Sequence, residues 1–528
     1  MLCRAGRLVY SIWMDETPSC DYDLCVIGGG INGAGIARDA QGRGLRVLLV
    51  EAQDLAGATS SASTKLIHGG LRYLETYEFG LVRKSLLERD VLLKAAPHLI
   101  RPLDFVLPHD KSLRPAVMIR TGLFLYDLLG TRLFKKRRLK CSEKLDFTAD
   151  ARGDALKEEY KKGFLYTDCW ADDARLVLLN ALDVLLRGGD VLTRTAVTKI
   201  ETRPERDGWR VRLKDLAQGD EGHITARAVV NAGGPWTHSI LVNSGLAEGA
   251  PGLRLVKGSH IVVPKLYDGA HAYILQQPDG RIVFAIPYEH KYTLIGTTDV
   301  ACEGDATHVK IDEAEKEYLI AAVNRAFKKQ ITPQKIVWSY SGVRALVDDG
   351  EGNVSKVTRD YRLYLDPHHT APLLSVFGGK LTTYRELAHE AVDILCKKLG
   401  VKKKCWTANV PLPGGEILDG DFQAFLENRR SYYDFLPDDL MTRYAHSYGL
   451  RMDIFLDGAK ALVDLGQDFG DGVYEAEIVY LIAHEFAREL DDILWRRSKL
   501  GLHISQQTYE RLEAALPGLL EGVKNVSV

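Results

Sequence analysis

Three glycines at the spacing Gly28-x-Gly30-x-x-Gly33, followed further along the chain by Glu51, have the clearest chemical meaning in this sequence. The first glycine permits a tight turn, the second lets backbone N–H groups approach a pyrophosphate, and the third lets a helix pack closely on a strand. Glu51 stands where a carboxylate accepts hydrogen bonds from a ribose, and no arginine follows it to receive a 2′-phosphate. These residues predict a dinucleotide site; a glycine turn without a ligand is the alternative.

The segments around the glycines have the periodicity that such a site requires. Tyr22–Ile27 is a short apolar run typical of a strand, residues 31–41 change to helical spacing, and residues 46–50 read as a second strand that ends at Glu51. The order of strand, glycine turn, helix, strand and acid makes the motif specific.

The residues that follow Glu51 favour FAD over NAD. An NAD-binding domain normally continues with further strand–helix repeats. This chain continues instead with a segment rich in hydroxyl groups and containing one cation, which suits a second approach to a pyrophosphate and a flavin. The residues concerned are Ser60, Ser61, Ser63, Thr64 and Lys65.

Residues 21–99 resemble the FAD-dependent glycerol-3-phosphate dehydrogenases, within the larger fold group of D-amino-acid oxidase and glutathione reductase. The resemblance rests on residues 28–40, 58–73 and 94–99, and it continues more loosely to residues 492–497. It implies an α/β plus α+β fold: a Rossmann-like FAD-binding domain, a substrate domain built on an antiparallel sheet, and a helical C-terminal cap. No cysteine lies near residues 378–383, so FAD is expected to be held without a covalent bond.

The domains are expected to be assembled from separated pieces. The FAD-binding domain is expected at residues 20–98, 155–250 and 341–400, the substrate-binding domain at residues 99–154 and 251–340, and the helical domain at residues 405–528. Strands are predicted at residues 191–202, 209–213, 224–230, 259–263 and 281–286, and at Tyr292–Gly296 and Leu373–Phe377. In the helical domain, a stripe repeating every four residues predicts core packing; its members are Ile478, Ile482, Phe486, Leu490 and Leu494.

Composition excludes several classes of protein. The 528 residues, 46% hydrophobic and 27% charged, can bury a large core in two or three domains, and a net charge of -2 argues against a nucleic-acid partner. Eight cysteines without a C-x-x-C pair indicate a reducing compartment. No metal site is expected, since His368-His369 lacks further ligands, and no apolar run is long enough to span a membrane. Either Met1 or Met14 is the expected start.

The resemblance implies further cofactor contacts from two later turns. One is the glycine turn at residues 231–236; the other, at residues 378–383, opens a helix whose N-terminus would stabilise negative charge on the reduced flavin. Together with the motif residues, the expected cofactor contacts are Asn32, Ser60, Ser61, Lys65, His68, Gly69, Val197, Gly233, Gly234, Trp236, Gly379, Lys380, Leu381 and Thr382.

A phosphate monoester requires cations, and planar guanidinium groups bind it better than an ammonium group does. Arg72, Arg344 and Arg359 are the candidates, each with the alternative of an ordinary surface or ion-pair arginine. By resemblance, Tyr73, Lys380 and Thr383 also approach the substrate.

Oxidation of a secondary alcohol needs a base for the hydroxyl proton. His68 and His260 are the candidate bases, each with a structural role as the alternative, and Arg344 near the alcohol oxygen would share the catalytic work.

These residues and the resemblance predict oxidation of sn-glycerol 3-phosphate to dihydroxyacetone phosphate by hydride transfer to FAD, with electrons passed to ubiquinone or a related quinone. A glycerol-3-phosphate oxidase using oxygen and an amine or amino-acid oxidase of the same fold are the enzymatic alternatives. Three pocket arginines would be excessive for the single carboxylate of an amino acid. A flavin-binding sensor is the non-enzymatic alternative.

A quinone reductase without a spanning helix is expected to lie on the inner face of the cell membrane as a peripheral, cytoplasmic protein. A homodimer and a monomer are the alternatives for its assembly. Residues 114–140 combine an apolar stretch with a basic one. The apolar members are Met118, Ile119, Leu123, Phe124, Leu125 and Leu128; the basic members are Arg132, Lys135, Lys136, Arg137, Arg138 and Lys140. A buried helix followed by a solvated basic loop is the alternative.

Overall fold

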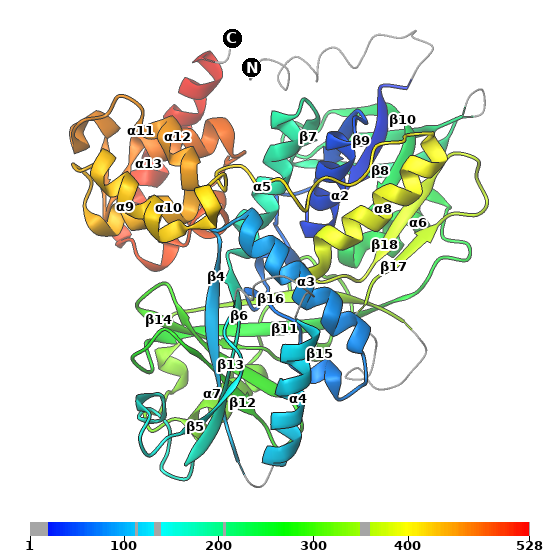
Figure 1. Cartoon of the computed structure of the whole chain (residues 1–528). Helices are drawn as coiled ribbons and strands as arrows, with labels where there is room; N and C mark the ends of the chain where they lie inside the picture. Colours follow the sequence, from blue (N-terminus) through cyan, green and yellow to red (C-terminus); the bar gives the residue numbers. More distant parts are fainter. Residues whose placement is uncertain (1–19, 111–113, 131–138, 204–206, 349–359, 527–528) are drawn as a thin grey trace.

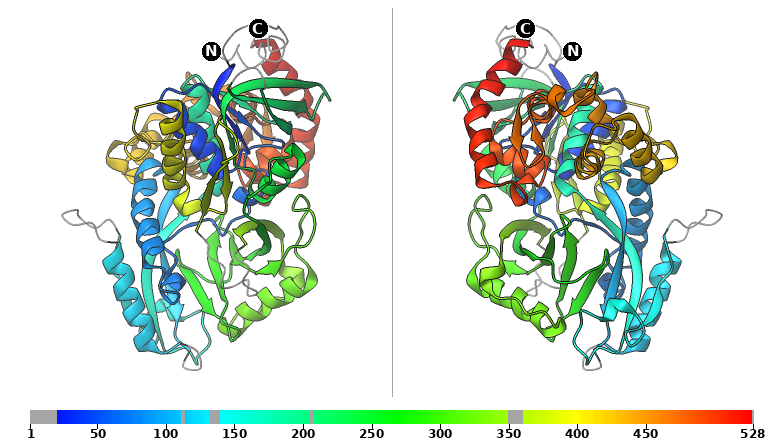
Figure 2. Two further views of the ribbon diagram at one scale, coloured as in Figure 1. Left: turned by 90° about the vertical axis from the view of Figure 1, so that its right-hand side faces the viewer. Right: turned by 90° about the vertical axis from the view of Figure 1, so that its left-hand side faces the viewer.

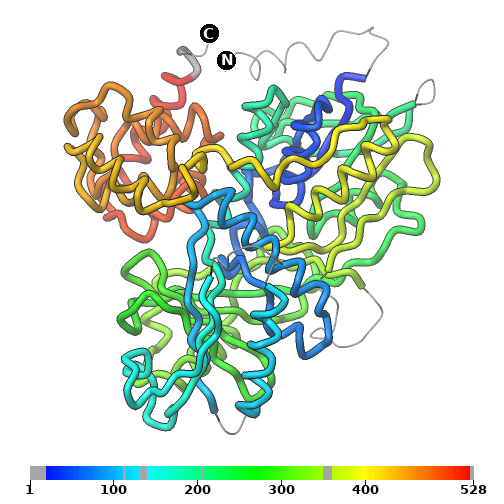
Figure 3. The backbone as a smooth tube through the Cα atoms, viewed as in Figure 1, coloured from blue at the N-terminus to red at the C-terminus, as the bar shows by residue number. Residues whose placement is uncertain are grey.

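The computed structural model describes residues 20–110, 114–130, 139–203, 207–348 and 360–526. The chain forms three parts: one built on a parallel sheet, one on a second, mainly antiparallel sheet, and a helical C-terminal part (Figure 1). The two sheet parts are each assembled from separated segments, whereas the C-terminal part is continuous in sequence (Figure 3). The fold that the sequence predicted is therefore present.

The first sheet has a parallel centre. Its strand order is β17-β18-β10-β1-β2-β7, and the neighbours from β18 to β7 run parallel. An antiparallel ribbon of β8 and β9 continues from β10. The bounds are β1 Tyr22–Ile27, β2 Val47–Val50, β7 Asp190–Leu192, β8 Thr195–Thr202, β9 Trp209–Asp215, β10 Glu221–Asn231, β17 Arg362–Leu365 and β18 Leu373–Phe377.

Both faces of the first sheet are covered. Helices α2 (Ile31–Gly42), α5 (Asp173–Leu186) and α8 (Tyr384–Leu399) share one aliphatic core with it. Asp172 begins α5 as a side-chain cap that accepts from the Arg175 N–H at 3.1 Å. The fully buried Trp209 lies in a second core, toward which α6 (Thr237–Ser244) also packs.

The second sheet is mainly antiparallel and has the order β15-β11-β14-β13-β12-β4-β6-β3, with β16 added to β11 and β5 to β6. Only β12 and β4 are parallel neighbours among the described strands of this sheet. Helix α7 covers one face and helices α3 and α4 cover the other (Figure 2). The bounds are β3 Leu66–Ile67, β4 Ile100–Pro108, β5 Glu143–Asp146, β6 Lys162–Ala171, β11 Leu253–Pro264, β12 Ala272–Gln276, β13 Ile282–Tyr288, β14 Tyr292–Gly296, β15 Val300–Ala301, β16 Trp338–Val347, α3 Phe79–Ala95, α4 Ala116–Leu129 and α7 Glu313–Ala326.

The C-terminal part is helical and has its own core. Its elements are α9 Phe422–Tyr432, α10 Asp438–Tyr448, α11 Asp453–Leu456, α12 Glu475–His484, α13 Gln506–Val526, a small hairpin of β19 Asp468–Gly470 and β20 Val473–Tyr474, and a π-helical turn at Asp492–Arg497. Among the described residues of the whole chain, no helix is both long and apolar enough to cross a bilayer.

The structure differs from the sequence prediction in the bounds of one strand and in the sheet to which two others belong. Residues 191–202 form two strands, because Arg194 adopts a left-handed conformation with φ of 55° between them. β6 and most of β16 had been placed in the FAD-binding domain, but they pair with β4 and β11 in the second sheet. Hydrogen-bond partners far away in sequence decide these memberships, and local residue patterns do not reveal them.

The predicted stripe of the C-terminal part does not lie on one helix. α12 ends at His484, and Phe486 has a positive φ of 62° before the π-helical turn begins. Ile478, Ile482 and Leu494 are nevertheless buried in the C-terminal core, whereas Phe486 packs against the core of the first sheet. The break directs this segment toward the first sheet.

Candidate cofactor and substrate site

The turn between β1 and α2 is closed so tightly that only glycine fits. Gly28 has a φ of +105°, and a Cβ there would lie 2.5 Å from the carbonyl oxygen of Ala232. A Cβ on Gly33 would overlap the carbonyl oxygen of Gly28. Gly30, the N-cap of α2, provides no side-chain cap, so the N-terminal N–H groups of α2 are oriented toward an anion.

Glu51 lies at the end of β2, close to the same turn. Its carboxylate accepts from the Gly29 N–H at 2.6 Å and from the Gln53 N–H at 2.7 Å. Burial raises the pKa of Glu51, and these two N–H groups oppose the rise. The acid is therefore held in place by one backbone N–H group of the glycine turn and one of its own loop.

The hydroxyl-rich segment after Glu51 reaches the same helix terminus. Ser60 Oγ accepts from the Ile31 N–H at 2.9 Å, and Ser61 Oγ donates to Ala58 O at 3.2 Å. Lys65, the cation predicted to approach the pyrophosphate, instead forms a buried ion pair with Asp173 at 2.7 Å. Asp173 therefore compensates the positive charge of Lys65. The sequence analysis had not identified Asp173 as a partner.

The second glycine turn follows β10 and touches the first turn through Ala232. Asn231 braces it, donating from Nδ2 to Thr237 O at 2.9 Å and accepting the Gly233 N–H at 3.3 Å. Gly234 has a φ of 56°, and the 3-10 helix that it begins ends at Trp236. Val197 lies at the bulge of β8, half-buried against the second core of the first sheet.

A third turn, between β18 and α8, lies opposite the first. Asn32 of α2 donates from Nδ2 to Gly378 O at 3.1 Å, and its Oδ1 is buried with no hydrogen-bond partner among the described residues. A Cβ on Gly379 would lie 2.8 Å from that Nδ2, so glycine is needed there too. The His68 N–H donates to Thr382 Oγ1 at 3.2 Å, which joins the Ser-rich segment to the start of α8.

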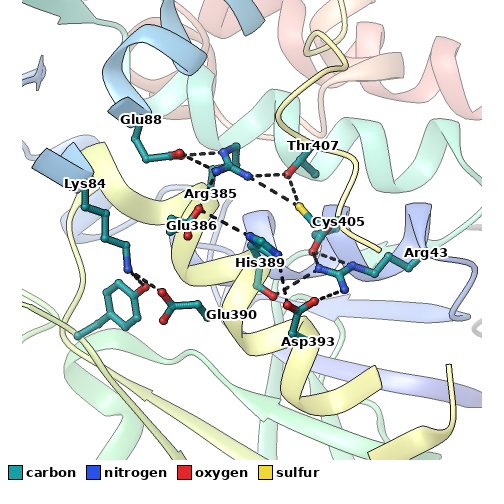
Figure 4. A network of polar contacts seen from close by, with 12 residues as sticks. Arg43, Lys84, Glu88, Arg385, Glu386, His389, Glu390, Asp393, Cys405 and Thr407 are labelled. Carbon is teal, nitrogen blue, oxygen red and sulfur yellow. Dashed lines mark hydrogen bonds and ion pairs between the residues drawn. The ribbon is translucent and has the colours of Figure 1, made fainter. Parts of the chain in front are cut away.

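Charged contacts hold α8 in place from its sides (Figure 4). They join Arg385 to Glu88 of α3 at 2.6 Å, Glu390 to Lys84 of α3 at 2.7 Å, and Asp393 to Arg43 at the end of α2 at 2.5 Å. The N-terminus of α8, with Leu381 and the buried Thr382 and Thr383, is thereby fixed relative to the first turn.

His260 lies on β11 in a buried position. Its ring stacks on Tyr340 with centroids 4.8 Å apart, and Nε2 lies 3.0 Å from Thr64 Oγ1. Burial, with Arg344 and Lys65 nearby, holds the pKa of His260 well below its usual range. Nδ1 is buried with no hydrogen-bond partner in the described part of the chain. His260 is therefore neutral, and Nδ1 is its basic nitrogen when Nε2–H donates to Thr64.

Arg344 lies on β16 and is already paired. It contacts the carboxylate of Asp299 and donates to Thr297 Oγ1 at 3.0 Å. Lys380 Nζ lies 3.8 Å from the centroid of the Tyr73 ring, which brings two predicted substrate residues together. Arg359 lies outside the described residues.

A cavity of about 550 Å³ adjoins these groups. Its polar lining includes His68, Arg72, Tyr73, Thr297 and Asp299, and apolar side chains of α4 and the second sheet line much of the rest. His260 and Arg344 do not line it, but Arg344 reaches it through Asp299. The sequence reasoning had not identified Thr297 and Asp299; their one signal is their place directly after a predicted strand.

These features fit FAD. The N-terminus of α2, whose N-cap Gly30 has no side chain, and the close glycine contacts suit a pyrophosphate. Glu51 suits a ribose, and the Asn32 oxygen and the α8 N-terminus suit a flavin ring with polar edges. Each lies where the resemblance predicted a cofactor contact.

The comparisons with known proteins agree. Residues 23–385 match the model of the FAD dependent oxidoreductase family, and residues 405–521 match that of the C-terminal domain of alpha-glycerophosphate oxidase. The aerobic glycerol-3-phosphate dehydrogenase of Escherichia coli is 51% identical over 93% of this chain and 96% of its own length. The D-erythritol 1-phosphate dehydrogenase of Brucella abortus is 49% identical over 93% of this chain and 97% of its own.

A solved structure of a relative has the same fold as this chain. The glycerol-3-phosphate dehydrogenase of Bacillus halodurans, solved with FAD, has a TM-score of 0.77 at 27% identity and covers 99% of this chain and 94% of its own. The chain therefore belongs to the FAD dependent oxidoreductase family, as the sequence predicted, and FAD is its cofactor.

Proposed function

We propose that this protein oxidises sn-glycerol 3-phosphate to dihydroxyacetone phosphate and passes the electrons to a membrane quinone. The observation that carries the proposal is the 51% identity, over nearly the whole chain, to a relative named aerobic glycerol-3-phosphate dehydrogenase. The cavity lined by Arg72 and Tyr73, with Lys380 against the Tyr73 ring, gives that substrate a cationic end. Anaerobic bleaching of the flavin by sn-glycerol 3-phosphate tests the proposal directly.

FAD supplies the two-electron acceptor for the hydride that leaves the substrate carbon. Arg72 and Lys380 bind the phosphate, together with Arg359. We assign the hydroxyl proton to His260 Nδ1, which is buried outside the cavity lining, so the alcohol must pass that lining to reach it; Arg344 favours the developing negative charge on that oxygen. His68 and Thr383 orient the reacting groups between the Ser-rich segment and α8.

A second substrate is favoured by a specific observation. The Brucella abortus relative named D-erythritol 1-phosphate dehydrogenase is nearly as similar as the glycerol-3-phosphate enzymes. The cavity of about 550 Å³ also falls in the range that holds much larger ligands than a three-carbon phosphate. The two phosphates share their charged end, so a comparison of kcat/KM for both identifies the physiological one.

We further propose that the protein is a peripheral protein on the inner face of the cell membrane, with α4 as its contact. Val117, Met118, Phe124 and Leu128 are exposed on α4, by 78%, 48%, 59% and 57%. Ile119 and Leu123, which the sequence had placed on the same surface, are buried and hold the helix to the second sheet. Of the predicted basic members, Lys140 is exposed, and Arg132, Lys135, Lys136, Arg137 and Arg138 lie outside the described residues.

Replacement of Gly30 by valine should abolish bound FAD. A Cβ at Gly30 meets only Ser60 Oγ, at 3.1 Å, so the added methyl groups would occupy the space of the pyrophosphate and leave the protein core intact. Flavin absorbance of the purified variant measures the loss. Gly80→Val is the matched control, since nothing lies within 4 Å of a Cβ there. Full FAD content in Gly30→Val would contradict the assignment.

Replacement of Arg72 by alanine should lower kcat/KM for glycerol 3-phosphate by roughly ten- to a hundredfold, the value of one charge-assisted contact. Arg344→Ala and Arg359→Ala should act in the same direction. FAD content should stay unchanged in all three, and unphosphorylated glycerol should be a very poor substrate. Normal kinetics in both Arg72→Ala and Arg359→Ala would place the phosphate elsewhere.

The pH dependence of kcat/KM should have no acid limb in the ordinary histidine range. The pKa of His260 is lowered in the folded enzyme, so its basic form is present at neutral pH and is lost only at more acidic pH. Steady-state kinetics with a soluble dye acceptor measure the profile. A limb that appears near pH 6.5 and persists in His260→Gln would assign the base to another group.

Replacement of Phe124 and Leu128 by serine should release the protein from anionic vesicles and slow quinone reduction, because apolar insertion is lost. Activity with a soluble dye should remain. Leu186→Ser is the matched control, since this leucine is 58% exposed on α5, away from α4. Vesicle binding that survives both changes, and also survives glutamine at Lys135, Lys136, Arg137 and Arg138, would exclude this surface.

A further inference from the structure

The loop after β2 carries Glu51 and is bonded closely to the glycine turn. Its Ala56 N–H donates to Gly29 O at 3.1 Å, and Glu51 accepts the Gly29 N–H at 2.6 Å. Any shift of this loop therefore moves the acid that faces the ribose. What holds the outer side of the loop thus decides how well the cofactor site is formed.

Asp54 is the residue through which the loop is held. It is only 4% exposed, and its carboxylate receives two arginines from the C-terminal part. Arg497 Nη2 lies 2.7 Å from Oδ1 and Nη1 contacts Oδ2, while Arg496 Nε lies 2.5 Å from Oδ2. Arg497 is itself fixed, because it donates twice to Glu485 O, at 2.8 and 2.6 Å.

A second bridge supports the same loop, and here the arginine lies beside the loop and the acid belongs to the C-terminal part. The Arg194 N–H donates to Gln53 O at 2.9 Å, so the backbone of Arg194 is bonded to the loop. Its guanidinium group lies 2.7 Å from Asp492 Oδ2, and Asp492 also accepts the Arg488 and Glu489 N–H groups at 2.7 and 3.0 Å. Burial alone would raise the pKa of Asp492, but Arg497, the Arg488 N–H, Arg194 and Arg496 together lower it to about 2.

Packing holds one side of the loop, where Leu55 and Ala56 are buried in the core of the first sheet. A cavity of about 190 Å³ lies beside the loop, lined by Gly57, Ala58, Thr59, Trp495 and Arg496 among others. Buried ion pairs add little net stability, because desolvation of the charges offsets their attraction, yet they impose direction and distance. Of the bridge residues Arg496 lines this cavity, so on that side of the loop a charged contact, more than close packing, sets its position.

We propose that the bridges of Asp54 with Arg496 and Arg497, and of Arg194 with Asp492, are a positioning device through which the C-terminal part sets the affinity for FAD. Arg496 and Arg497 act through Asp54 on Glu51. The inference rests on the proposed placement of the FAD ribose at Glu51. The C-terminal part is then a component of the cofactor site as well as a cap.

The test is the rate of FAD release from the full-length holoprotein, followed by flavin fluorescence well below the unfolding temperature. Arg496→Gln and Asp54→Asn should each accelerate release at least about fivefold, the low end of typical coupling between sites. Arg496→Lys, which keeps the charge, should restore release to within about twofold of the unaltered protein. Combining Arg496→Gln with Asp54→Asn should have less effect than the two single effects together, because the two changes share the Arg496–Asp54 contact.

Arg443→Gln is the matched control. Arg443 pairs with the fully buried Glu477 at 2.5 Å and donates to Gly472 O at 2.8 Å, both inside the C-terminal part. The Arg443→Gln variant should have a lower Tm but should release FAD within about twofold of the rate of the unaltered protein. Release no faster in Arg496→Gln than in Arg443→Gln would overturn the proposal. Glu51→Ala tests separately whether the ribose lies at Glu51 and whether the bridges act on it. Fast FAD release from Glu51→Ala with normal release from Arg496→Gln would refute the role of the bridges alone. Normal release from both variants would refute the ribose placement as well.

Discussion

The contact between the two glycine turns is the constraint on which the rest of the structure depends. β1 and β10 are parallel neighbours, so their turns leave the same edge of the sheet and meet where Gly28 touches Ala232. No side chain fits between Gly28 and Gly33, and α2 therefore starts directly over the end of β1. That start fixes the direction of the helix N-terminus, and Glu51, Ser60 and Asn32 are placed around it by hydrogen bonds of their own.

Polar contacts then join the two sheets across the site. Thr64 meets His260 of the second sheet, Lys65 pairs with Asp173 of α5, and the Tyr340 hydroxyl donates to Ser63 O at 2.8 Å. These partners lie far apart in sequence but all contact one short segment, residues 63–65. That segment therefore sets the distance between the cofactor turns and the cavity, and its hydroxyl groups have structural partners as well as their predicted role at the flavin.

Local signals in the sequence were sufficient for elements whose partners are local or whose ends are glycine turns. The predicted bounds of β1, β14 and β18 match the structure. The membership of β6 in the second sheet was not predictable, because a strand's alternation is the same in either sheet. The pairing of Lys65 with Asp173 was likewise invisible, since an ion pair between residues 108 positions apart leaves no spacing pattern.

The electrostatics of the candidate site follow from the same long-range pairing. Lys65 and Arg344 both lower the pKa of His260, yet each is paired with an acid, Asp173 or Asp299. The pairing limits the cost of burying the cations and leaves a field that disfavours a second positive charge. An imidazole in that field stays neutral, whereas a phosphate or a developing alkoxide is favoured by it. Burial is the main reason why the pKa of His260 is lowered, and the two cations add to it; the same cations would favour an anionic substrate in the proposed function.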